Sequence, residues 1–359
     1  MVYGANGFSG RAIAGRLKAA GHDPVLAGRN GREIAAVAAA LGVECRGFDL
    51  RDPEVVADGM MDVGVLLNAA GPFIETAPPL IEACIRGGAH YLDLAGEWPV
   101  FDLALRRGPE AAAAGAMLMP GAAFSIVVSD CILAHAVAQV PDAVLLRVAT
   151  AQAPLSRGSV LSAIALMSPD VLVRRGGAVT KIPVGRLKRT FNFGAGEQTC
   201  VAVSAPDVVT GQQTTGVGAI ETYLEAPPAW RLAYEAGAVA LKLKGRKAVG
   251  EALRGASRRW PEHPSPAAIA AARGAVVVET VDPWRRTRRF GLRTLDGYSV
   301  TVAAAMAAVE RVLRGDLTPG FQTPAGRYGA GLVVSLGCAW TYDASPFAAL
   351  AVDPPSGGG

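Results

Sequence analysis

The sequence predicts an α/β fold in which a doubly wound parallel sheet is followed by a second domain of α+β type. Over the first third of the chain, short apolar runs alternate with helix-like segments every 20 to 30 residues or so, which is typical of parallel strands covered by helices. After residue 122 an amphipathic helix and several short alternating runs follow, which is typical of a mixed or antiparallel sheet. A chain of 359 residues is long enough for two such domains.

The first element is a strand end that leads into a glycine-rich turn, VYGANGFSG at residues 2–10, with a helix behind it at 11–17. Gly4 suits the tight turn, Gly7 lets a pyrophosphate approach the backbone, and Gly10 lets the helix pack closely on the strand. The start of that helix offers unpaired N–H groups to an anion. Three glycines at this spacing also suit an ordinary turn, so the interpretation depends on the surrounding elements.

The segment after this helix indicates whether the chain binds NAD(H) or NADP(H). Residues 22–27 form a second apolar run and complete a βαβ unit. A protein that binds NAD(H) carries an acid at the end of this strand for the ribose 2′-OH, whereas this chain has Gly28-Arg29-Asn30. A guanidinium suits a 2′-phosphate, so we predict NADP(H); the alternative is that Arg29 is only a solvated surface charge.

The remaining strands of the first domain continue the alternation. A third run at 43–50 places Asp49 at its exit, and ligands bind outside such strand ends. A fully apolar fourth run at 62–70 exits at Gly71-Pro72-Phe73, where small residues would let the backbone lie against a cofactor and Phe73 could pack near the nicotinamide. A strand-to-helix turn with no binding role is the alternative.

Two more strands close the first domain, which we expect to end near residue 122. The fifth run, 89–95, ends in Gly96-Glu97-Trp98, and the sixth covers 116–120. Between them we predict a single helix over 100–114.

Several motifs in sequence order resemble the saccharopine dehydrogenase-like oxidoreductases, a family that includes the trans-acting enoyl reductases. The motifs are YGANGFSG, LAGRN, NAAGPF, GAHYLDLAGE, PGAAFSIVVSD and FQTPAGRYG, and they are densest in residues 2–130. The resemblance implies an NADP-binding Rossmann domain, an α+β domain with substrate and dimer contacts, and a late return of the chain to the first domain. We therefore expect domains at 1–122, 123–315 and 316–350, followed by a disordered tail at 351–359.

The same resemblance assigns cofactor contacts to particular residues. It implies pyrophosphate contacts from Gly4, Asn6, Gly7, Phe8 and Gly10, and adenosine phosphate contacts from Arg29 and Asn30. It places Asp49 near the adenine, and it places Ala70, Gly71, Pro72 and Phe73 on the nicotinamide side. The resemblance leaves the substrate open, because family members act on different bonds.

In the second domain we predict helices over 127–140, 159–167 and 303–314, with a basic, partly amphipathic helical region between Trp230 and Trp260. We predict a strand over 143–151, and the predicted short strands that follow are 190–193, 199–204, 219–225, 276–280 and 299–303. The basic region could contact a lipid surface or an acyl carrier, although such a run is more often a solvated helix face or an oligomer contact.

Catalytic groups are less evident than the cofactor turn. Asp93, at a strand end, and Asp130, near a helix start, are the best-placed carboxylates; both are weak candidates, and Asp130 could simply stabilise its helix. Glu97 is weaker still. The Tyr-x-x-x-Lys pair of short-chain dehydrogenases is missing, and the four histidines and five scattered cysteines show no metal-ligand spacing, so we expect no metal.

We therefore predict an NADPH-dependent oxidoreductase that delivers hydride to a C=N, C=C or C=O bond of a small-molecule or acyl substrate. A substrate with two or three carboxylates would require several converging arginines. The first part of the second domain offers only Arg147, Arg157, Arg174 and Arg175. The alternative is a non-catalytic NADPH-binding module, acting as a redox sensor or as a partner of a lipid surface or complex. A net charge of +4 argues against nucleic acid, and we expect a cytoplasmic homodimer.

Overall fold

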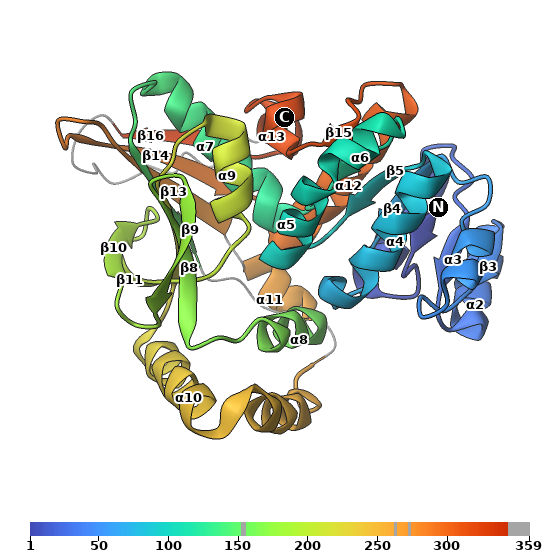
Figure 1. The fold of residues 1–359 in the computed structure, drawn as a ribbon, viewed down its shortest axis with the longest axis horizontal. Coiled ribbons are helices and arrows are strands. Elements are labelled where there is room, and N and C mark those ends of the chain that lie inside the picture. Colours follow the sequence, from blue (N-terminus) through green and yellow to red (C-terminus); the bar gives the residue numbers. More distant parts are fainter. Residues whose placement is uncertain (152–155, 262–263, 272–273, 344–359) are drawn as a thin grey trace, which may run out of the picture.

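A computed structural model describes residues 1–151, 156–261, 264–271 and 274–343, and these residues form two sheets. The first sheet has seven strands and the second has nine, with helices packed on both (Figure 1). The α/β class and the doubly wound parallel sheet predicted from the sequence are confirmed. The predicted tail at 351–359 lies outside the described residues.

Every neighbouring pair of strands in the first sheet is parallel. The spatial order is β15-β6-β5-β4-β1-β2-β3. The strands are β1 Val2–Tyr3, β2 Leu26–Gly28, β3 Cys45–Gly47, β4 Val65–Asn68, β5 His90–Asp93, β6 Met117–Met119 and β15 Gly320–Phe321. The chain order reverses between β1 and β4, and at such a switch point the strand ends leave room for a ligand.

Helices connect these strands in the expected alternation. They are α1 Phe8–Ala19, α2 Gly31–Leu41, α3 Pro53–Gly59, α4 Phe73–Gly87, α5 Trp98–Arg106 and α6 Gly108–Ala113. The single helix predicted over 100–114 was wrong, because it is two helices. Pro109 starts α6, and Gly108 passes so close to β15 that a Cβ there would lie 3.2 Å from the Cβ of Phe321.

The predicted strand at 299–303 was also wrong, because these residues belong to helix α12, Gly297–Leu313. Asp296 caps this helix by accepting hydrogen bonds from the backbone N–H groups of Tyr298 and Ser299 at 3.0 and 2.9 Å. A cap of this kind favours helix over strand for the residues that follow it. The alternating pattern at 299–303 gave no indication of the cap.

Helix α12 packs on the first sheet although in the chain it lies within the second sheet, before its last strand. Its buried residues Ala305 and Val309 share a core with Ile13 and Leu17 of α1. The sequence assigned α12 to the range 123–315 of the second domain, and it assigned strand β16, Ala339–Asp343, to the returning segment. Strand β16 instead pairs with β14, Thr287–Thr294, in the second sheet. The domain limits themselves stay predictions.

The second sheet is mixed. Its main path runs β10-β11-β12-β7-β13-β14-β16, while β8 pairs with β12 and β9 pairs with β8. The strands before β16 are β7 Leu145–Thr150, β8 Asp170–Arg175, β9 Ala178–Pro183, β10 Lys188–Asn192, β11 Glu197–Ala202, β12 Ile220–Glu225, β13 Gly274–Val281 and β14 Thr287–Thr294. Four of the five predicted short strands are therefore strands, and the strands β8, β9, β14 and β16 were missed.

Helix α7, Phe124–Gln139, covers one face of this sheet, where its Ile132 and Leu133 share a core with Val148 and Val278. The other helices are α8 Arg157–Ala165, α9 Asp207–Thr215, α10 Pro228–Ser257, α11 Pro266–Ala271, α13 Pro324–Tyr328 and α14 Leu332–Ser335. No helix within the described residues has the length and apolarity that crossing a membrane requires.

Candidate cofactor and active site

The glycine turn after β1 is so tight at Gly4 and Gly10 that a side chain would not fit at either position. Gly4 has a φ of +85°, and a Cβ at Gly4 would lie 2.8 Å from the Cβ of Ala70. A Cβ at Gly10 would lie 2.3 Å from the carbonyl oxygen of Gly4. The two glycines therefore hold β1, the start of α1 and the turn after β4 in close contact.

The N-terminus of α1 suits an anion. Its first turn has no acidic residue, and its N-cap, Gly7, provides no side-chain hydrogen bond to the helix. The first amides of a helix have no partner within the helix, and the helix dipole favours a negative charge there. The residues present at this turn thus fit a pyrophosphate.

The end of β2 carries Arg29 and Asn30, both exposed. Asn30 caps α2, and its amide donates to Glu33 Oε1 at 2.6 Å, while the amide of Asn6 donates to Glu33 Oε2 at 2.7 Å. Glu33 therefore joins the glycine turn to the start of α2. Glu33 was not among the residues predicted from the sequence, although an acid three residues after an N-cap asparagine resembles a capping box and could have indicated it.

Asp49 follows β3 and lies within electrostatic reach of Arg29. Hydrogen bonds from Arg51 lower the pKa of Asp49 to about 2. Arg51 donates through Nε at 3.0 Å and through Nη2 at 2.8 Å. The structure thus brings Arg29, Asn30 and Asp49 to the same part of the sheet edge, beside the glycine turn.

A buried polar chain holds the turn at Ala70–Phe73. Asn68, at the end of β4, accepts a hydrogen bond from the backbone N–H of Ala70 at 3.0 Å and donates to the hydroxyls of Thr76 and Tyr91. The Tyr91 hydroxyl in turn donates to Asp93 at 2.8 Å. Asp93 was a candidate from the sequence, whereas Asn68, Thr76 and Tyr91, which connect it to the turn, were not.

Asp93 is fully buried at the end of β5. Its Oδ1 accepts hydrogen bonds from the backbone N–H groups of Gly121 at 2.7 Å and Ala95 at 2.9 Å. Burial raises the pKa of Asp93 to about 7, although these hydrogen bonds oppose the shift. A carboxyl group enclosed in this way ties the end of β5 to the end of β6, so the contacts favour a structural role over a catalytic one.

Asp130 lies inside the protein, on α7. It accepts hydrogen bonds from the hydroxyl of Thr214 at 2.5 Å and from the backbone N–H of Ala325 at 2.7 Å, and so joins α7 to α9 and α13. Burial raises its pKa to about 6. Its contacts also favour a structural role, the alternative that the sequence left open.

Glu97 has more contacts at this edge than the sequence suggested. Its Oε1 accepts hydrogen bonds from the backbone N–H of Phe73 at 3.1 Å and from the Ser162 hydroxyl at 2.7 Å, while its Oε2 accepts from Gly96 N–H at 3.0 Å. Ser162 belongs to α8. Glu97 is therefore a buried link between the predicted nicotinamide turn and the second part of the chain.

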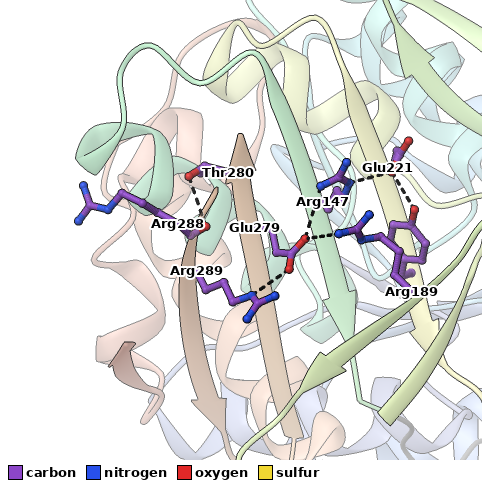
Figure 2. Close-up of polar contacts among 8 residues, drawn as sticks. Arg147, Arg189, Glu221, Glu279, Thr280, Arg288 and Arg289 are labelled. Atoms are coloured by element: carbon purple, nitrogen blue, oxygen red, sulfur yellow. Dashed lines mark hydrogen bonds and ion pairs between the residues drawn. The ribbon is translucent and has the colours of Figure 1, made fainter. Parts of the chain in front are cut away.

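The arginines of the second sheet are engaged with protein groups. Figure 2 shows buried Glu279 between Arg147, Arg189 and Arg289, at 3.5, 3.2 and 2.9 Å, and Glu221 beside Arg147. The remaining candidates for carboxylate recognition also have partners: Arg175 pairs with Glu221, Arg174 donates to Val208, and Arg157 donates to Trp260. Among the described residues, no cluster of histidine, cysteine and acidic side chains could hold a metal ion.

Comparison with known families identifies the first part of the chain. Residues 1–119 match the saccharopine dehydrogenase NADP binding domain. This part of the chain is therefore similar to that NADP-binding family. Its glycine turn, its uncapped α1 and its arginine after β2 are consistent with this assignment.

Known relatives of this NADP-binding domain include reductases. A trans-acting enoyl reductase of Mycobacterium leprae is 32% identical over 145 residues, and Rv2449c of Mycobacterium tuberculosis, provisionally named as such a reductase, is 33% identical over 142 residues. Each alignment covers 36% of this chain and 33% of the relative. The chain thus spans about a third of the length of these relatives.

The fold similarity extends beyond the NADP-binding domain. The apo saccharopine dehydrogenase (L-Glu forming) of Saccharomyces cerevisiae aligns with a TM-score of 0.64 at 12% identity, over 95% of this chain and 98% of that protein. At this identity the match shows a shared fold and no more. The arrangement of the two sheets is therefore shared with that protein.

Proposed function

We propose that the protein is an NADPH-dependent oxidoreductase that transfers hydride to a C=N, C=C or C=O bond of a small-molecule or acyl substrate. The observation that carries the proposal is the glycine turn of the NADP-binding domain, where the uncapped start of α1 lies beside Gly4 and Gly10, two positions at which a Cβ would clash with the backbone. The nicotinamide cofactor would supply the hydride, and the protein would supply position and electrostatics.

The residues of the turn and the strand ends have distinct roles in this proposal. Gly4, Gly7 and Gly10 allow the approach of the pyrophosphate, with Asn6 and Phe8 beside it. Arg29 and Asn30 bind the 2′-phosphate, and Asp49 lies at the adenine side. Ala70, Gly71, Pro72 and Phe73 border the nicotinamide, and Glu97 positions Phe73 through its backbone N–H.

An acyl substrate is favoured over a polycarboxylate. Recognition of several carboxylates needs converging arginines with open N–H groups. Arg147 and Arg175 are held by Glu221, and Arg174 donates to two backbone carbonyls, of Val208 and Gly177. Because these arginines already bind protein groups, they favour a less polar substrate, such as an acyl or enoyl group, over one with several carboxylates.

The test is a titration of the purified protein with NADPH and NADH, followed by nicotinamide fluorescence. We expect NADPH to bind more tightly and Arg29→Ala to weaken NADPH binding about tenfold or more, with little effect on NADH, because a charged hydrogen bond is lost. Arg32→Ala, an exposed arginine on the next helix, serves as the matched control. If Arg29→Ala weakened NADPH and NADH binding equally, the assignment of Arg29 to the 2′-phosphate would be wrong.

The non-catalytic alternative predicts a different result. A redox sensor or a lipid- or complex-associated module would bind NADPH without oxidising it in any substrate screen.

We also propose that the protein forms a homodimer and makes a peripheral membrane contact through residues 230–260. Sedimentation of the purified protein tests the homodimer, and the membrane contact is argued below from α10.

A further inference from the structure

Helix α10 presents large aliphatic side chains to solvent. Leu232, Val239 and Leu243 are 72%, 57% and 79% exposed. Their spacing of seven and four residues places them on one face of the helix. Ala238 and Leu241 on the other face are buried, so the exposed face is distinct from the one that packs against the protein.

The surroundings of this apolar face are strongly basic. Helix α10 contains six basic and two acidic residues, and two further arginines, Arg258 and Arg259, follow it directly. Lys244 and Lys247 are exposed and flank the kink at Gly245, where φ is +78°. Trp230 and Trp260 lie partly exposed near the two ends. An apolar stripe with basic flanks and terminal tryptophans is typical of a helix that lies in the interface of an anionic membrane.

Helix α10 is joined to α8. Arg157 of α8 donates to the carbonyl oxygen of Trp260 at 2.9 Å, and Arg246 of α10 donates to the carbonyl oxygen of Ala165. Figure 1 shows α10 along the lower border of the molecule, with α8 between it and the NADP-binding domain. Through Ser162, α8 then contacts Glu97, which holds the backbone N–H of Phe73. A continuous set of contacts thus connects the exposed helix to the predicted nicotinamide side.

We propose that α10 docks on an anionic lipid surface and that the active site takes an amphiphilic acyl substrate from that surface. The surface follows from α10 alone, whereas the substrate class rests on the proposed function. A second copy of the chain is a less suitable occupant, because two such basic helices placed face to face would repel each other. Anionic lipid would instead neutralise the lysines and arginines while the aliphatic side chains leave water.

The lipid surface is tested by cosedimentation of the full chain with vesicles of phosphatidylcholine, with and without phosphatidylglycerol. We expect binding to the mixed vesicles that weakens at high salt. Leu232→Gln with Leu243→Gln should weaken it at least about tenfold, and Lys244→Gln with Lys247→Gln by about fivefold per charge removed. The matched control is Leu313→Gln, which alters a leucine that is 53% exposed at the end of α12. If the protein does not bind the mixed vesicles, or if the control loses binding equally, the proposal that α10 docks on anionic lipid is wrong. A larger species in the absence of vesicles that the leucine substitutions abolish would also contradict it, because α10 would then contact a second copy of the chain.

The substrate class is tested with two probes that share one reacting bond. A long-chain 2-enoyl thioester is carried in the mixed vesicles, a short-chain 2-enoyl thioester is dissolved in water, and NADPH oxidation is followed. We expect at least a tenfold higher rate with the vesicle-held probe, and loss of that preference in the Leu232→Gln, Leu243→Gln variant, whose NADPH affinity stays unchanged. A faster rate with the short probe, or reduction of neither, would overturn the substrate class. Failure of NADPH binding would instead refute the proposed function and leave the vesicle result standing.

Discussion

Asp93 shows how a residue can occupy a suggestive position and still be enclosed by the protein. It stands where a strand end meets the predicted site, yet both of its oxygens accept hydrogen bonds from the protein. A buried carboxyl group with a raised pKa is often a candidate for catalysis, but structural networks raise a pKa in the same way. Its partners decide between the two, and here they are backbone amides and a buried tyrosine.

Asp93 should make the protein less stable as the pH rises. Its pKa in the folded state, about 7, exceeds the ordinary value of an aspartate, so folding favours the protonated form. The stabilisation is complete below the unfolded-state pKa, and it is lost as the pH rises through about 7. We expect the free energy of unfolding of Asp93→Asn, from urea titrations between about pH 5 and pH 8, to fall less with pH than that of the wild type.

Asp58→Asn, which alters an exposed aspartate on α3, provides the comparison for that experiment. Asp130 should contribute to the same decline, because burial also raises its pKa, to about 6. The slope should therefore be reduced in Asp93→Asn and not abolished. A wild-type slope in this variant would contradict the assignment.

At the scale of elements, α1 depends on glycine at one position and tolerates it at another. Gly10 lies against the backbone of the glycine turn, whereas a Cβ at Gly15 of the same helix would meet nothing within 4 Å. The same residue type thus serves close packing in the first turn of the helix and has no packing role in the second. Only the packing of α1 on the turn distinguishes them.

This difference predicts opposite effects of the same substitution. Gly10→Ala should lower the free energy of unfolding by about 1–3 kcal/mol, because its Cβ would lie 2.3 Å from the carbonyl oxygen of Gly4. Gly15→Ala should raise it by about 0.5–1 kcal/mol, because alanine favours a helix where space is free. Urea denaturation of both variants measures the contrast. Similar effects of the two substitutions would show that α1 packs differently on the turn.

At the scale of the whole molecule, the two sheets are connected by elements that cross between them. Helix α12 lies between β14 and β16 of the second sheet in the chain but packs on the first sheet, and its Thr301 hydroxyl accepts a hydrogen bond from Phe124 N–H of α7 at 3.1 Å. Glu97 and Ser162 form a second connection, across 65 positions of sequence. The position of α8 relative to the NADP-binding domain therefore depends on a few polar contacts.

Removal of the Ser162 hydroxyl should loosen α8. Ser162→Ala leaves a buried carboxylate oxygen of Glu97 with one partner fewer, and hydrogen bonds to charged groups contribute about 1.5–3 kcal/mol. We expect backbone amides of α8 to exchange hydrogen at least about tenfold faster, with no change in α1. Ser159→Ala, which removes a hydroxyl that hydrogen-bonds to Ser156 at the start of the same helix, is the control. Unchanged exchange in Ser162→Ala would mean that other contacts hold α8.

Sequence alone determined the parallel sheet, the glycine turn with Arg29 beyond β2, and most strands of the second sheet, because local periodicity and turn chemistry encode them. The placement of α12, the division of the predicted helix at Gly108, and the buried chain Asn68–Tyr91–Asp93 were decided only in the tertiary structure. Each depends on partners far away in the chain, as when Asp130 accepts a hydrogen bond from a residue 195 positions later. Glu97 is the clearest case: its sequence position marks a strand end, but its link to Phe73 and Ser162 exists only because folding brings three segments together, and no pattern within one segment can encode that meeting.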